Sequence, residues 1–170
     1  MNKQIERVIE SLKIRSSNEQ NSFKIFQLGR LPVDVTCKFY PGATVTELRK
    51  LKELGLPADY LDFLRITNGL ELFDEGGSMS VICHIYSVQE VFKVRDFMKN
   101  SGFYSEEDLF PILQLRDIGE IYINRIKYVA GENYLSYPFP DNNYFQFSFA
   151  EWLERFVVGE GSEFWYFLNL

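Results

Sequence analysis

The chain has 170 residues, enough for one domain with its own hydrophobic core. Hydrophobic residues make up 46% and charged residues 25%, proportions that argue against disorder over most of the chain. The net charge of −6 is unevenly spread, because residues 51–170 carry nineteen acidic and nine basic side chains. An acidic body repels phosphate backbones, so direct nucleic-acid binding is disfavoured.

The chain carries no sequence signal for a membrane or for export. It has no run of about 18 apolar residues, which a transmembrane helix would need. The N-terminal segment mixes charged and apolar residues and lacks the apolar run of a signal peptide. With Cys37 and Cys83 as its two cysteines, the chain is predicted to be cytoplasmic with reduced thiols.

The first predicted element is an amphipathic helix over residues 3–14. Its apolar residues are spaced to form one stripe: Ile5, Val8, Ile9 and Leu12. Residues 15–22 are polar and are predicted to form a loop, and residues 23–28 a short strand.

Two helices follow. Thr44 and Glu47 have the spacing of a capping box, which predicts a short helix that Gly55 ends. Pro57 suits a first helical position, and Asn68–Gly69 is predicted to end this second helix because both residues tolerate the left-handed conformation.

The second half of the chain alternates between strand and helix signals. Residues 76–87 are typical of a strand that follows a glycine turn, and Ser87 with Glu90 predicts a second capping box and a helix to about Asn100. The β pattern then covers three segments, at residues 109–116, 120–130 and 143–149.

A closing helix is predicted from Ser148, with Glu151 at its third position. Helices first, then strands, then this helix predict an α+β fold: a single domain with an antiparallel-rich sheet flanked by helices.

The sequence offers no pattern for catalysis. His84 is the one histidine, and it should point to the opposite face of a strand from its neighbour Cys83, so the two do not suit one metal ion. Zinc-ligand, phosphate-loop and nucleophile-elbow motifs are all missing. We therefore expect no catalytic residue, no cofactor and no metal.

Two segments suit a binding surface. Residues 71–77 are predicted to form an acidic loop that carries an exposed aromatic ring, and residues 133–144 mix rings, prolines and asparagines as interface loops often do. The alternative for each ring is that it folds back onto the core.

Residues 56–69, LPADYLDFLRITNG, resemble the signature of the SUKH superfamily. The matching residues are Leu56, Pro57, Asp59, Tyr60, Phe63, Leu64, Asn68 and Gly69. Segments 85–90, 110–112 and 148–153 resemble later family motifs in the family's order, whereas 116–120 departs from a frequent Gly-Asp-Gly. Because residues 1–30 match no motif, they are assigned to an N-terminal helix and loop extension, and residues 31–170 to a SUKH-like domain.

The resemblance implies an α+β fold with a sheet flanked by helices. For bacterial members it also implies an immunity protein that binds and neutralises a secreted or contact-delivered toxin, often a nuclease. We expect a basic toxin as the partner, bound by acidic and aromatic side chains that occlude its active site. The hypothetical contacts are Glu71, Phe73, Asp74, Glu75, Asp117, Glu120 and Asp141.

The signature residues are assigned to structure rather than to partner binding.

Two other functions stay open at this point. One is a regulatory scaffold for protein–protein interactions, as in eukaryotic members of the family. The other is an enzyme that acts on carbohydrate or nucleotide, which would need a pocket with paired carboxylates. The sequence does not indicate the oligomeric state.

Overall fold

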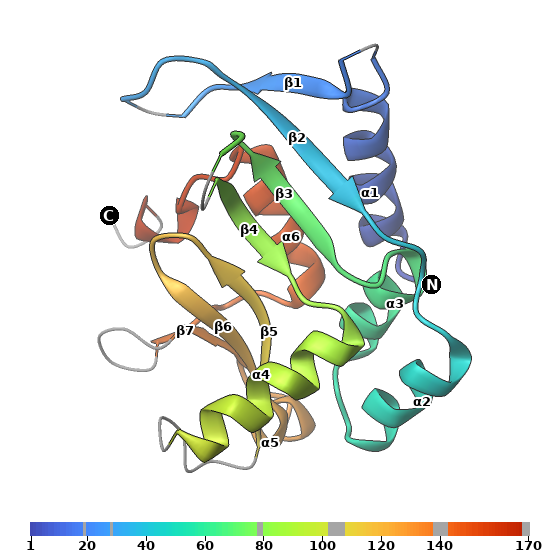
Figure 1. The fold of residues 1–170 in the computed structure, drawn as a ribbon. Coiled ribbons are helices and arrows are strands. Elements are labelled where there is room, and N and C mark those ends of the chain that lie inside the picture. The colour runs from blue at the N-terminus through green and yellow to red at the C-terminus, as the bar shows by residue number, and fades with distance from the viewer. Residues whose placement is uncertain (19, 28, 78–79, 102–107, 138–142, 168–170) are drawn as a thin grey trace.

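One antiparallel sheet runs through the molecule (Figure 1). The computed structural model describes residues 1–18, 20–27, 29–77, 80–101, 108–137 and 143–167. Within them, the strands lie side by side in chain order: β1 (Ser22–Ile25), β2 (Val33–Phe39), β3 (Leu70–Asp74), β4 (Val81–Ile85), β5 (Leu109–Leu115), β6 (Gly119–Asn124), β7 (Leu135–Tyr137) and β8 (Asn143–Tyr144). The predicted fold class is confirmed, because helices flank this sheet in a single α+β domain.

The helices lie on both faces of the sheet (Figure 1). Their bounds are α1 (Lys3–Arg15), α2 (Val45–Glu53), α3 (Ala58–Ile66), α4 (Val88–Asn100), α5 (Arg125–Val129) and α6 (Phe149–Val158), followed by the 3-10 helix η1 (Phe164–Phe167). Helices α1, α3 and α6 pack together on one face, and α4 crosses the other. No helix of the described residues is long and apolar enough to cross a membrane.

Three helices begin at capping boxes, as the sequence predicted. The N-cap residues are Thr44, Ser87 and Ser148. In each box a glutamate three residues later accepts a hydrogen bond from the N-cap N–H, at 2.7, 2.8 and 2.8 Å respectively. Each box satisfies two backbone groups that the first turn of a helix leaves unpaired.

The strand predicted over 120–130 is wrong in its second half, because Arg125–Val129 forms helix α5. The side chain of Asn124 accepts a hydrogen bond from the Lys127 N–H at 3.1 Å, and this cap outweighs the β-type pattern of the residues that follow. Pro57 also differs slightly from the prediction, since it is the N-cap of α3 and not its first helical residue.

The N-terminal helix belongs to the core. The stripe predicted from the sequence is buried, with Ile5 and Leu12 fully inaccessible, and α1 packs against α3 and α6. Residues 1–30 thus supply one helix of the helical layer and the edge strand β1 of the same sheet.

Candidate partner-binding site

The polar residues of the segment 56–69 hold two helices in place. Asp59 Oδ2 accepts a hydrogen bond from the Ala150 N–H at 2.9 Å, in the first turn of α6. Asn68 Oδ1 accepts one from the Val88 N–H at 2.8 Å, in the first turn of α4. Both side chains satisfy backbone donors that a helix start leaves open, so this segment serves the fold.

The acidic segment 71–77 is largely strand and not the predicted loop. Glu71 to Asp74 belong to β3, which lies between β2 and β4. The buried leucines at positions 70 and 72 account for this, because they give the segment an apolar side that faces the core. The turn between β3 and β4 begins only at Glu75.

The prediction that Phe73 is exposed is also wrong. Its ring is fully buried, with ring centroids 6.1 Å from both Phe23 and Phe156. A β-bulge explains this position. Between the pairs Thr36–Asp74 and Lys38–Glu71, β3 spans one residue more than β2, and within this bulge Phe73 takes a positive φ of 58°. The bulge turns this side chain toward the core, where no partner can reach it.

A row of polar side chains crosses the sheet on the face that carries α4. Directly paired residues share one face, and the pairing connects Lys38, Glu71, His84, Gln114 and Glu120 from β2 to β6. Lys38 and Gln114 are exposed, so α4 does not cover the whole row. Two predicted contact residues, Glu71 and Glu120, therefore lie on one surface, separated by the strands β4 and β5.

The two carboxylates of the row have internal partners. Lys38 Nζ lies 3.3 Å from Glu71 Oε1, which also accepts a hydrogen bond from the Tyr40 hydroxyl. The hydroxyl of Tyr86 donates to Glu120, with oxygen distances of 2.7 and 2.9 Å. Burial raises the pKa of Glu120 to about 7, although the hydrogen bond from Tyr86 opposes that shift. Near neutral pH this side chain is only partly ionised.

Asp74 and Glu75 differ from Glu120, because their surroundings favour the charged form. The hydroxyl of Ser80 and the N–H of Gly76 donate to Asp74 and lower its pKa. The guanidinium of Arg116 lies 2.9 Å from Glu75 and lowers the pKa of that carboxyl, against a smaller effect of burial. Arg30 adds a second ion pair to Glu75, at 3.1 Å.

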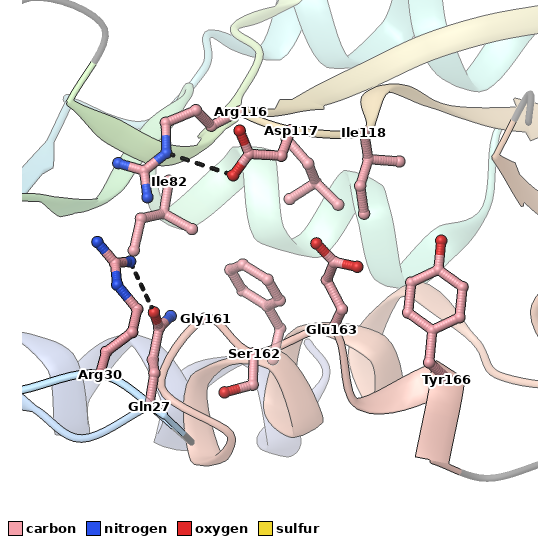
Figure 2. A pocket seen from close by; sticks show the side chains of 12 residues that line it. Gln27, Arg30, Ile82, Arg116, Asp117, Ile118, Gly161, Ser162, Glu163 and Tyr166 are labelled. Atoms are coloured by element: carbon pink, nitrogen blue, oxygen red, sulfur yellow. Dashed lines mark hydrogen bonds and ion pairs between the residues drawn. The ribbon is translucent and has the colours of Figure 1, made fainter. Parts of the chain in front are cut away.

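A cavity of about 370 Å³ opens beside this ion-pair group (Figure 2). The β1–β2 connection, the ends of β4 and β5 and the segment that follows α6 form its walls. Its apolar lining consists of Ile82, Leu115, Ile118 and Phe156. Its polar lining includes Gln27, Arg30, Arg116, Asp117, Ser162 and Glu163.

Two carboxylates, those of Asp117 and Glu163, line this cavity. The side chain of Asp117 is 78% exposed and lies 3.7 Å from Arg116 Nε. Glu163 is half-buried, and no ion pair to it is found among the described residues. Desolvation raises the pKa of Glu163, and the negative charge of Asp117 adds to this effect.

Of the predicted contacts, Asp117 lines the cavity and Glu75 pairs with two of its arginines, whereas Asp141 lies outside the described residues. Sequence reasoning missed Glu163, Arg30 and Arg116. No local pattern marks them, because the cavity joins segments that are far apart in the chain. The one available signal in the sequence was that the last ten residues, like residues 1–30, match no SUKH motif.

The described residues show no arrangement typical of a metal site, since no group of three or more histidine, cysteine, aspartate or glutamate side chains could hold an ion. Burial raises the pKa of both cysteine thiols, which disfavours the nucleophilic thiolate form. His84 Nε2 lies 3.4 Å from the Glu90 carboxylate, and its ring packs edge-on against Tyr86.

No protein-family model matches the chain. Among curated proteins, it is similar to a protein of Bacillus subtilis (strain 168) that bears the name Uncharacterized protein YobM. The two are 25% identical over 133 residues, which cover 72% of this chain and 70% of that protein. The name of this relative states no activity, so the SUKH resemblance stays a prediction.

Proposed function

We propose that the protein is a cytoplasmic immunity protein of the SUKH type, which binds a basic toxin and blocks its active site without catalysing a reaction. The toxin is proposed to be a nuclease delivered by secretion or by contact. The observation that carries this proposal is the cavity, whose lining combines the carboxylates of Asp117 and Glu163 with apolar side chains. An apolar centre with a polar rim is the usual composition of a protein interface.

The charge distribution supports a basic partner. A nuclease holds the phosphates of its substrate in a basic groove, which an acidic protein can approach quickly and cover. Residues 51–170 supply an excess of ten acidic side chains. The ion pairs of Glu75 fix this carboxylate before the partner arrives, so little side-chain entropy is lost on binding.

The structure changes which residues we propose as contacts. Phe73 is buried and cannot reach a partner, and Glu120 is only partly charged near neutral pH, so both leave the proposed set. Asp117 and Glu163 now lead the set, with Glu71 as a more distant member on the sheet face.

The test begins with a tagged pull-down from the source organism, grown with its secretion systems active, and mass spectrometry of the bound proteins. A dominant partner with a basic C-terminal domain is then co-expressed with this protein in a sensitive host. We expect rescue of growth by the wild-type chain and its loss in an Asp117→Arg/Glu163→Arg variant. Glu10→Arg, which changes an exposed residue of α1, is the matched control.

Two results would contradict the proposal. If growth is not rescued by the wild-type chain at matched expression, neutralisation is wrong. If the pull-down instead returns a mixture of signalling or cell-envelope proteins, a regulatory scaffold becomes the better explanation.

A further inference from the structure

We propose that the cavity receives one arginine side chain of the partner protein, whose guanidinium pairs with Glu163 and Asp117 while its aliphatic part packs on the apolar lining. This inference rests on the proposed function for the identity of the partner. The cavity itself can be tested without any toxin.

Charge complementarity selects a cation as the occupant. Arg30 and Arg116 already pair with Glu75, and Arg116 also pairs with Asp117, so these four charges largely compensate one another. The carboxylate of Glu163 is left over, and Figure 2 shows it pointing into the cavity. An anion would meet two guanidinium groups that are already engaged, whereas a cation would meet a carboxylate with no ion-pair partner among the described residues.

The lining of the cavity favours a guanidinium over an ammonium. Ile82, Leu115 and Phe156 line the cavity and can cover the methylene groups of a long side chain. Tyr166 is 51% exposed at the same cavity and presents an aromatic ring, on which a planar guanidinium can stack. A guanidinium can also donate to two carboxylates at once, which an ammonium does with less geometric fit.

The segment that carries Glu163 is held in place at both ends. Gly161 has a φ of 81°, and a Cβ at this position would lie 3.0 Å from the Phe73 ring, so glycine lets the chain pass close to the sheet. Trp165 is 5% exposed and packs edge-on against Phe145, with ring centroids 5.2 Å apart. Glu163 lies between these two anchors, so the backbone that carries it is already fixed before a ligand binds.

The experiment is an NMR titration of the full chain with three capped tripeptides, Ac-Gly-Xaa-Gly-NH₂, in which Xaa is arginine, lysine or citrulline. Citrulline keeps the shape of arginine but is uncharged. We expect shifts in the amide signals of residues 115–118 and 161–166, with arginine binding more tightly than lysine and citrulline not binding. Glu163→Gln should weaken arginine binding about tenfold, and Glu10→Gln should leave it unchanged.

Equal binding of the arginine and citrulline peptides, or no effect of Glu163→Gln in a chain with a native-like spectrum, would overturn the proposal. No binding of the arginine peptide would overturn it as well. None of these results affects the rescue experiment, so a failure of the cavity proposal and a failure of the immunity proposal can be told apart.

Discussion

The individual carboxylates of this protein differ in charge state because their neighbours differ. Asp74 and Glu75 accept hydrogen bonds from donors that favour the ionised form, and their pKa values are lowered. Burial acts in the opposite direction on Glu120 and Glu163 and raises their pKa values. Sequence reasoning treated the acidic residues as one class, since the sequence does not show which carboxylate will be half-buried against a tyrosine.

Glu120 should make the stability of the fold depend on pH. Its pKa is about 7 in the folded protein and near the ordinary 4.5 in the unfolded chain, so the fold favours the protonated form. Its contribution is fully present below pH 4.5 and is lost as the pH rises through 7. Relative to Glu120→Gln, the wild type should lose about 1 to 2 kcal/mol between pH 5 and pH 8, a figure reduced for solvent screening at this partly exposed site.

Urea denaturation of both proteins from pH 5 to pH 8 measures this loss directly. The difference between the two free energies of unfolding isolates Glu120 from every other titrating group. Glu10→Gln, at an exposed position of α1, should run parallel to the wild type across the whole range. A constant difference between wild type and Glu120→Gln would show that Glu120 has no raised pKa.

The burial of Phe73 differs from what its sequence context indicated. A phenylalanine in a segment rich in acidic residues suggested an exposed ring in a loop, but the bulge and the positive φ place it in the core. A bulge depends on the pairing of β3 with β2, which lies more than 30 residues earlier in the chain, so no local pattern could have indicated it.

Between elements, the approach of the turn after α3 to the start of α4 depends on Gly69. This residue has a φ of 102°, and a Cβ there would lie 3.2 Å from the Ser87 nitrogen and 3.3 Å from the Ile85 oxygen. Gly131 offers a matched control, since it also has a positive φ, of 73°, but a Cβ at that position would meet no atom within 4 Å. Gly69→Ala thus adds two tight contacts with backbone atoms to the strain of a positive φ, whereas Gly131→Ala has the positive φ alone.

We expect Gly131→Ala to lower the free energy of unfolding by about 1 kcal/mol and Gly69→Ala by about 2 to 4 kcal/mol. Thermal and urea unfolding of the two variants and the wild type provide the comparison. Equal losses for both would mean that the approach of Gly69 to Ser87 contributes nothing beyond backbone strain.

The elements that the sequence predicted well are those with local signals. The capping boxes at Thr44, Ser87 and Ser148 each satisfy the helix start within four residues, so three helix beginnings were predicted correctly. Strands β2 and β3 were missed because a strand is stabilised by partners elsewhere in the chain. The cavity was missed for the same reason, since four separate segments form it.

At the scale of the whole molecule, the N-terminal residues contact both the helical layer and the segment that follows α6. Helix α1 packs on α3 and α6, and Asn2 caps α1 while its N–H donates to Asp62 in α3 at 2.7 Å. At the other end of the helix, Arg15 pairs with Glu160 at 2.9 Å, next to the segment that forms the cavity. Residues 1–30, which match no SUKH motif in the sequence, thus support both the core and the candidate site.

A chain that starts at Leu31 should therefore fail to fold cooperatively. Its loss of α1 would expose the surfaces of α3 and α6 that now cover Ile5, Ile9 and Leu12, each at most 1% exposed. Burial of one such side chain contributes about 1.5 to 3 kcal/mol, and a whole domain is stable by only about 5 to 15 kcal/mol. Near-ultraviolet circular dichroism should show the loss of fixed tryptophan packing, and urea unfolding should lose its sigmoidal transition.

Point substitutions on α1 test the same idea in the full chain. Ile5→Ala removes a fully buried side chain and should cost about 2 to 5 kcal/mol, whereas Ile14→Ala, at a 67% exposed position of the same helix, should cost less than about 0.5 kcal/mol. If the shortened chain unfolds like the wild type and both substitutions are neutral, residues 1–30 are a dispensable extension. If Ile5→Ala alone is costly, α1 is part of the domain, and any partner-binding assay requires the full chain.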